Sequence, residues 1–401
     1  MQYLSIYVLK PVFILLLKIF DDIINDINLR KVILLSKITF IKPIDGDVLF
    51  ENADGIVKGK YLYTDILVSA PKQSEVTVNG IKATETESGI YCASVPLDSY
   101  RNTVEAVCNG ETEKAVLFWF KGGYKTYRLG IDDVIRCFEN IYKHQNEYTS
   151  IFDDPFLKVY YDVHKQYGTH VHMHIYYQND DGSFNLSMFP DKYKDEFRAN
   201  SDWLRFSFHS LTDKPDSPYK NATYEQVMRE GRMVESEILR FAGAEVMDHV
   251  TSQHWADSNI YGTRAFRALG FKVIDGYFIF DDEGNPMVSY YLNAEQARHA
   301  HTRDFWVDTK EDIIFVKDDI ILNEPFYSLE DIDAELDKLK ASEDYSFMYL
   351  LIHEQYFYED YEVYEPDYRD RVFRGVKWCV DNGYRSSWIS DFALEKLPGR
   401  Q

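Results

Sequence analysis

The alternation of strand-like and helix-like segments from about residue 126 onward constrains the fold of this chain more than any other feature. The strand-like segments are rich in β-branched and aromatic residues, and segments with apolar residues at helical spacing follow them. At least six alternations predict an α/β fold with parallel strands, most simply a barrel. The expected strands include TYRLGIDDV (126–134), HVHMHIYY (170–177), WLRFSFHS (203–210), FKVIDGYFIF (271–280) and FMYLLIHEQYF (347–357).

The sequence before residue 126 has a different organisation. Between residues 39 and 121, short alternating runs are separated by turn residues, and Asn79-Gly80 is a strong signal for a two-residue hairpin. These features predict a small antiparallel β-sandwich domain, immunoglobulin-like or carbohydrate-module-like. We expect the β/α barrel over residues 126–395, with an insert at about 281–325 that carries its own hairpin. Residues 1–38 are expected to form an N-terminal extension of apolar and charged residues.

Composition and charge limit the partners of the chain. A formal net charge of −22 argues against nucleic acid, because a phosphate backbone requires a basic face. The 31 tyrosines and 26 phenylalanines suit both a large core and stacking on sugar rings. The apolar run from Val12 to Leu17 is shorter than the ~18 residues of a membrane helix, so no stable membrane span is expected. No convincing signal peptide is recognisable, which leaves the localisation open between the cytoplasm and export to the cell surface.

Polar clusters stand where several expected strands end, which is where catalytic groups gather in a β/α barrel. Asp132 and Asp133 end the first barrel strand, and adjacent residues on a strand point to different sides, so these carboxylates could take different tasks. His209 and Asp213 follow the third strand and offer imidazole and carboxylate ligands to a metal ion. His353 ends the apolar strand FMYLLIH and suits a general acid. A helix cap, a polar surface turn and a buried core histidine are the respective alternatives.

A row of histidines lies on one face of the strand HVHMHIYY. His170, His172 and His174 alternate along it, and only the last could reach a site at the carboxyl end of the strand. A same-face histidine row can bind a metal ion, or it can line a polar barrel interior. We therefore keep His174 as a candidate for contact with a substrate or an ion.

The order GIDD, HSLTD and LIH resembles the motifs of the polysaccharide deacetylase superfamily, the NodB-type carbohydrate esterases. The resemblance implies that Asp132 is the base and that Asp133 binds the metal. It implies that His209 is a second ligand, with Asp213 in the place of the family's second histidine. The late motif implies that His353 is the general acid.

The resemblance covers roughly residues 126–392 and implies a distorted parallel β/α barrel, a divalent metal ion with Zn²⁺ as the expected ion, and a polysaccharide or oligosaccharide substrate. The family's Arg-x-Pro motif has no clear counterpart. SQHWADSN stands near its expected place and offers His254 and Trp255 as substrate contacts. Tyr356 is a further aromatic candidate for stacking on a sugar ring, and Glu354, which ends the same strand as His353, is a further candidate for substrate binding.

These features together predict a metal-dependent hydrolase that removes N- or O-acetyl groups from a carbohydrate. Two alternatives stay open. A glycoside hydrolase would use a pair of carboxylic acids, drawn from Asp132, Asp133, Glu354 and Asp257, on either side of a glycosidic bond. A catalytically inactive protein on the same fold would bind a polysaccharide through aromatic side chains.

Overall fold

The computed structural model describes residues 37–341 and 346–395, so nearly all of the expected N-terminal extension lies outside the described residues. The chain forms two compact units. Among the described residues, unit 1 comprises 37–47 together with Asp54–Trp119, and unit 2 comprises Val48–Ala53 and the residues from Phe120 onward. Within residues 37–341 and 346–395, no helix combines the length and the apolar character needed to cross a membrane.

Unit 1 consists of antiparallel strands in two sheets. The strand burial alternates, as in Tyr61–Ser69, where every second side chain is buried. Asn79 and Gly80 both have positive φ values, of 49° and 75°, and form the expected two-residue turn. The first sheet contains β1 (Thr39–Lys42), β4 (Tyr61–Ser69), β8 (Ile90–Leu97) and β7 (Thr84–Glu87), with β3 (Ile56–Lys58) beside β4. The second contains β10 (Glu111–Trp119), β9 (Arg101–Cys108), β5 (Val76–Val78) and β6 (Ile81–Lys82).

Unit 2 is built on a parallel sheet with β11 (Thr126–Val134) near its centre. The strand order is β13-β12-β11-β21-β20, and β22 also pairs with β11. In this sheet Asp132 is the register partner of His353, so two of the expected site residues end neighbouring strands. The other strands are β12 (Val171–Tyr176), β13 (Leu204–Ser210), β20 (Ile320–Ile321), β21 (Phe347–His353) and β22 (Arg385–Ser386).

A second sheet of unit 2 has the order β14-β15-β19-β18, and only β18 runs antiparallel to its neighbour. A backbone hydrogen bond of 3.1 Å from Asp248 N to Phe206 O connects β13 with the segment that leads into β14. The strands are β14 (Val250–Ser252), β15 (Val273–Gly276), β18 (Phe305–Asp308) and β19 (Ile313–Lys317). Unit 2 is therefore a mixed α/β structure with mainly parallel strands.

The segment 281–325 differs from the expected insert. It contributes to a hairpin between β16 (Ile279–Phe280) and β17 (Pro286–Val288), as predicted. However, it also supplies β18, β19 and β20 to the sheets, because the short runs FWVD and IIFVK are buried almost completely. These strands are short and closely spaced, so they do not show the strand–helix alternation by which the rest of unit 2 was recognised.

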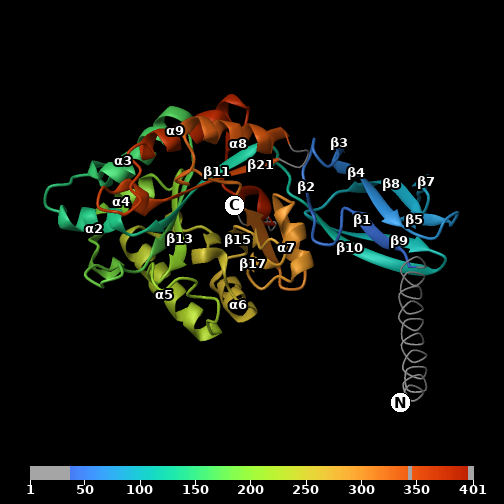
Figure 1. Ribbon diagram of the computed structural model, residues 1–401, viewed down its shortest axis with the longest axis horizontal. Coiled ribbons are helices and arrows are strands. Elements are labelled where there is room, and N and C mark those ends of the chain that lie inside the picture. The colour runs from blue at the N-terminus through green and yellow to red at the C-terminus, as the bar shows by residue number, and fades with distance from the viewer. Residues whose placement is uncertain (1–36, 342–345, 396–401) are drawn as a thin grey trace, which may run out of the picture. The chain divides into compact units, whose positions relative to one another are not determined.

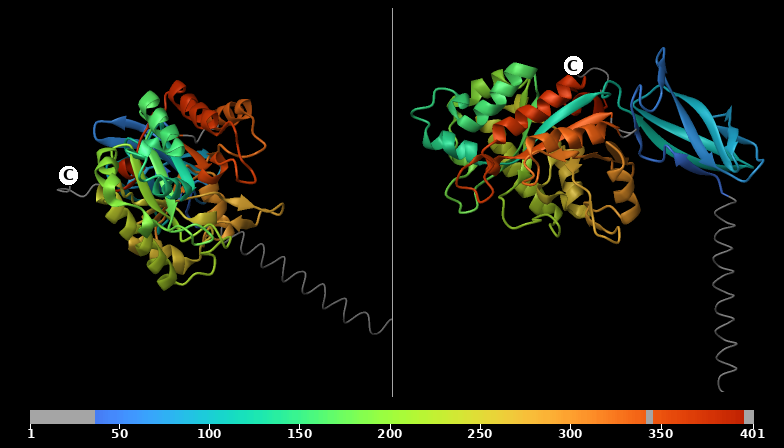
Figure 2. Two further views of the ribbon diagram at one scale, coloured as in Figure 1. Left: turned by 90° about the vertical axis from the view of Figure 1, so that its left-hand side faces the viewer. Right: turned by 45° about the horizontal axis from the view of Figure 1, so that its top comes forward.

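Helices pack around the strands of unit 2. Figure 1 shows α3, α8 and α9 together along one side of the strands and α5 and α6 along another, and the end-on view in Figure 2 shows helices outside and strands between them. Helix α3 ends as predicted at Gly168, whose φ of 70° closes it. The helices are α2 (Arg136–Lys143), α3 (Pro155–Tyr167), α4 (Lys194–Ala199), α5 (Tyr224–Phe241), α6 (Ile260–Leu269), α7 (Ala294–His301), α8 (Leu329–Ala341), α9 (Tyr368–Asp381) and α10 (Ser390–Ala393).

The central strands β11 and β12 alternate between side chains of the hydrophobic core and polar side chains that contact one another. On β11, Leu129 and Ile131 belong to the hydrophobic core, whereas the alternating Arg128 contacts polar groups of other strands. On β12, Met173 lies in the core, and the histidines beside it face Arg128. The carboxyl end of this polar face carries the candidate site.

Candidate metal centre

The backbone of Asp133 brings two neighbouring carboxylates to the same histidine. Asp133 has a φ of 65°, in the left-handed region, and the pairing of β11 with β12 shifts register between Ile131 and Val134. Adjacent side chains of a regular strand point to opposite faces. Here, His209 Nε2 lies 3.1 Å from Asp133 Oδ1 and 3.9 Å from Asp132 Oδ2. The left-handed residue thus places both carboxylates at one site, where they keep different partners.

Asp133, His209 and His254 form a compact group of possible metal ligands. Asp133 Oδ1 lies 3.1 Å from His209 Nε2 and 3.3 Å from His254 Nδ1, and the two nitrogens lie 3.2 Å apart. Ligands at roughly 2.0–2.1 Å from a tetrahedral Zn²⁺ are separated by about 3.3–3.4 Å. The three side chains are also buried. The donor set and its spacing therefore fit a divalent ion such as Zn²⁺.

Hydrogen bonds fix which nitrogen of each histidine can act as a ligand. His209 Nδ1 lies 2.5 Å from the carbonyl oxygen of Ser252, which can only accept, so Nδ1 donates and the lone pair of Nε2 faces Asp133. His254 Nε2 donates in the same way to the carbonyl oxygen of Asp213 at 2.9 Å, which leaves the lone pair on Nδ1. Such backbone acceptors orient metal-binding imidazoles.

Asp213 occupies a different place from the one expected of a ligand. Its carboxylate Oδ1 lies 3.5 Å from His254 Nε2, the nitrogen that faces away from the ligand group, and its side chain is 36% exposed. The structure thus brings together the predicted ligands Asp133 and His209, and it adds His254 from the loop after β14. Asp213 contacts His254 on the side of the ring that faces away from the ligand group.

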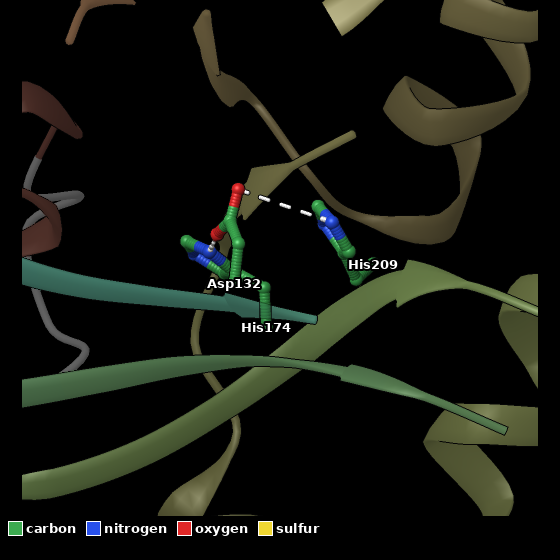
Figure 3. A group of neighbouring side chains, drawn as sticks. All are labelled: Asp132, His174 and His209. Carbon is green, nitrogen blue, oxygen red and sulfur yellow. Dashed lines mark hydrogen bonds and ion pairs between the residues drawn. The ribbon is translucent and has the colours of Figure 1, made fainter. Parts of the chain in front are cut away.

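A second set of possible ligands, Asp132, His174 and His209, fits an ion less well. His174 Nε2 lies 2.6 Å from a guanidinium nitrogen of Arg128, which can only donate. The neutral ring of His174 therefore carries its proton on Nδ1 and donates it to Asp132 Oδ1. Figure 3 shows the ring of His174 against one oxygen of Asp132. A protonated nitrogen cannot bind a metal ion, which favours the set with Asp133.

The charges of the site are strongly coupled. Burial raises the pKa of both Asp132 and Asp133, but His209 outweighs this effect and holds each pKa below its ordinary value, with help from His174 and His254 respectively. Burial lowers the pKa of His209, but the two carboxylates outweigh it and raise the pKa to about 9. When no ion is bound, protonated His209 therefore supplies the positive charge that faces the two carboxylates.

Two residues that the sequence patterns did not single out contact Asp133. The hydroxyl of Tyr176 donates to Asp133 Oδ1 and lies 3.0 Å from His254 Nδ1, and Gln355 Nε2 donates to Asp133 Oδ2 at 2.6 Å. Burial keeps the pKa of Tyr176 well above its usual value, so the phenol stays a donor. Tyr176 continues the alternation of His172 and His174, a signal that could have identified it.

Tyr176 and Gln355 line a pocket together with Asp133, Ile135, Arg136, Glu139, Gln178, Asn179, Asp180, Asp213 and Tyr361.

His353 lies at the end of β21, half-buried and beside Asp132 in the sheet. Its ring Nδ1 donates to Asn323 Oδ1 at 3.1 Å, and its backbone N donates to the same oxygen at 2.9 Å. The neutral ring therefore carries its proton on Nδ1, which leaves the lone pair on Nε2. Asn323 had no signal in the sequence, because it lies in the short turn after β20.

The candidates for substrate contact separate into exposed and enclosed side chains. Trp255 is 50% exposed next to His254, with a left-handed φ of 68°, and Tyr356 is half-buried against the ring of His353. His174 and Glu354 have no exposed surface, so the structure places them away from solvent and from any large ligand. Glu354 instead accepts hydrogen bonds of 2.6–2.7 Å from the backbone nitrogens of Ile135, Arg136 and Cys137, at the start of α2.

Comparison with protein families and with curated proteins finds no family model and no protein that matches this chain. Solved structures do match it. A family 4 acetyl xylan esterase from Clostridium thermocellum, in complex with a cobalt ion, is 10% identical with a TM-score of 0.38, over 67% of this chain and 90% of that chain. A peptidoglycan N-acetylglucosamine deacetylase is 10% identical with a TM-score of 0.36, over 67% and 88%. A 4-alpha-glucanotransferase from Thermococcus litoralis is 13% identical with a TM-score of 0.43, over 67% and 40%. Carbohydrate deacetylases are thus among the solved structures to which this chain is similar.

Proposed function

We propose that this protein is a metal-dependent hydrolase that removes acetyl groups from the sugar units of a polysaccharide or oligosaccharide. The observation that carries the proposal is the convergence of Asp133 Oδ1, His209 Nε2 and His254 Nδ1, with Asp132 beside them. The proposal includes the predicted distorted β/α barrel, whose strand ends would carry the site, and a β-sandwich in unit 1.

Asp133, His209 and His254 would hold the ion, with Zn²⁺ as the expected metal. When bound, such an ion supplies Lewis acidity towards an acyl carbonyl and a water molecule. Asp132 is the base in this proposal. Its lowered pKa keeps it ionised, and Ser252 Oγ donates to its Oδ2 at 2.7 Å. Asp132 would take the proton of the attacking water and so make it a better nucleophile.

His353 would return a proton to the leaving group. It ends the strand next to Asp132, and Asn323 holds Nδ1 of its ring, so Nε2 would be the atom that donates. The phenol of Tyr176 is a donor close to Asp133 and His254, and it would stabilise negative charge that develops on the acyl oxygen. Protonation of the leaving group by His353 matters more for removal of an N-acetyl group than of an O-acetyl group, because an amine leaves poorly without a proton.

The substrate would enter from the pocket lined by Asp133, Tyr176 and Gln355. Amide, carboxylate and phenol groups in this pocket can form hydrogen bonds with sugar hydroxyls. The exposed ring of Trp255 lies beside His254 and would stack on a sugar ring.

Acetate release from N-acetylated and O-acetylated oligosaccharides, measured with and without a chelator, tests the proposal. We expect release that stops on chelation, returns with a divalent ion, and is lost in His209→Ala. His170→Ala is a matched control, because His170 is a half-buried histidine of the neighbouring segment that contacts Ser386. Absence of acetate across the panel contradicts the proposal. Cleavage of an unmodified glycan that survives chelation would instead indicate a glycoside hydrolase.

A further inference from the structure

A chain of buried polar groups runs from the candidate base into the interior of unit 2. Asp132 Oδ1 accepts the Nδ1 proton of His174, and His174 Nε2 accepts a hydrogen bond from Arg128 at 2.6 Å. A second guanidinium nitrogen of Arg128 donates to Asp275 Oδ2 at 2.9 Å. The four side chains come from β11, β12 and β15 and are at most 5% exposed. Three strands therefore hold one connected network beneath the site.

The network gives His174 a single protonation pattern. Arg128 has no acceptor atom, so a histidine nitrogen at 2.6 Å must present its lone pair. The only proton of the neutral ring is then on Nδ1, where Asp132 accepts it. A second proton on His174 would break the bond to Arg128 and place two cations side by side. Asp275 neutralises Arg128 and holds it in place.

The two oxygens of Asp132 have different surroundings. Oδ1 is occupied by His174, whereas Oδ2 accepts from Ser252 Oγ at 2.7 Å and faces His209 Nε2 at 3.9 Å. Figure 3 shows Asp132 between the two histidines, with one oxygen directed to each. The contact with His174 thus fixes the rotation of the carboxylate and directs Oδ2 towards the metal ligands.

We propose that His174 is a positioning residue, which holds the carboxylate of Asp132 with Oδ2 towards the reacting water, and that Arg128 sets the tautomer of His174 for this task. The inference rests on the proposed function. His174 itself contacts neither substrate nor ion, because it is fully buried and its Nδ1 carries a proton.

Two near-isosteric substitutions at His174 test its hydrogen bonds to Asp132 and to Arg128 one at a time. Asparagine places an amide N–H close to the position of Nδ1 and can still donate to Asp132. Glutamine reaches the position of Nε2 and can still accept from Arg128, but it offers no donor to Asp132. His172→Ala is the matched control, since His172 Nδ1 also accepts from Arg128, at 2.8 Å, and no hydrogen bond joins His172 to Asp132 among the described residues.

We expect His174→Ala and His174→Gln to lower kcat on the order of 10–100-fold, as removal of partners that orient ligands does. KM and bound metal should stay unchanged, because His174 does not line the substrate pocket and no hydrogen bond joins it to the three ligands among the described residues. His174→Asn should recover most of kcat, and His172→Ala should retain it. Selective ¹⁵N labelling of histidine should show His174 as the Nδ1–H tautomer in both the metal-free and the metal-loaded protein.

Three results would overturn the inference while leaving the proposed function intact. The first is full kcat in His174→Gln, and the second is an Nε2–H tautomer or a doubly protonated ring in the ¹⁵N spectrum. The third is loss of metal in His174→Asn, because the ring would then be a ligand. A wild-type protein without turnover overturns the proposed function and the role of His174 together.

Discussion

His254 and Asp213 provide the sharpest test of the candidate metal centre, because the sequence motif and the structure assign the third ligand differently. The motif places Asp213 where the superfamily has a histidine. In the structure, His254 Nδ1 lies 3.3 Å from Asp133 Oδ1 and 3.2 Å from His209 Nε2. We therefore predict that His254→Ala abolishes tight metal binding and that Asp213→Ala largely retains it.

The expected loss of metal affinity follows from the number of ligands for His254→Ala and from the contacts of Asp213 for Asp213→Ala. Four-ligand zinc sites in zinc-finger peptides bind with roughly 10–16 kcal/mol, or about 2.5–4 kcal/mol per ligand. Loss of His254 should therefore weaken binding on the order of 100–1,000-fold. Asp213→Ala keeps the backbone carbonyl that accepts from His254 Nε2 at 2.9 Å, and at the site it loses the carboxylate contacts with His254 Nε2 at 3.5 Å and with the Tyr176 hydroxyl at 3.3 Å. Its effect should stay below about tenfold, at the weak end for partners that orient ligands.

Competition with a chromophoric chelator of known zinc affinity measures both variants, and metal content per chain confirms the stoichiometry. His170→Ala serves as the control for loss of a histidine elsewhere. Circular dichroism and thermal unfolding establish that each variant is folded. Equal loss of affinity in Asp213→Ala and His254→Ala would refute the assignment, and so would unchanged affinity in His254→Ala.

Three further predictions concern other parts of the site. His353→Ala should lower kcat on an N-acetylated substrate on the order of 100–10,000-fold without loss of metal, and steady-state kinetics showing an unchanged kcat would exclude His353 as the acid. Glu354→Ala removes the acceptor of three backbone N–H groups and should lower the free energy of unfolding by roughly 3 kcal/mol; an unchanged urea midpoint would contradict this. In the metal-free protein the pKa of His209 is raised from its ordinary value of 6.5 to about 9. The contribution of protonated His209 to the free energy of unfolding is therefore complete below pH 6.5 and is lost as pH rises through 9. Urea unfolding between these limits should therefore show a fall of up to roughly 3 kcal/mol that His209→Gln lacks, and parallel curves for the two proteins would speak against it.

Regular alternation made much of unit 2 predictable from the sequence. The strands β11, β12, β13 and β21 lie where apolar and polar residues alternate or where an apolar run ends in a histidine. The strand ends marked the pair Asp132-Asp133 and His209 as candidates, because parallel strands collect their carboxyl ends at one edge, and the resemblance to the deacetylase motifs singled out Asp133 as the ligand. Local patterns therefore located both the sheet and two of the three candidate ligands.

The remaining features depend on contacts that no local pattern records. His254 joins Asp133 through a loop in which Trp255 and Ala256 both have positive φ, a conformation that non-glycine residues seldom adopt. The strands within 281–325 are too short to show a period, and they are held by neighbours distant in the sequence. Glu354 resembles a site residue in sequence because it follows His353. In the structure, its carboxylate instead accepts hydrogen bonds from the start of helix α2, over 200 residues away in the sequence.

The left-handed backbone at Asp133 matters for transplanting such a site into another scaffold. An Asp-Asp pair copied onto an ordinary strand would send its second carboxylate to the opposite face, where it would meet the helices. The position makes two demands at once, a short carboxylate and tolerance of positive φ, and aspartate satisfies both. Asparagine would keep the bend and remove the charge, while a β-branched residue would resist the bend itself. A designer must therefore specify the shape of the main chain at this residue before choosing its side chain.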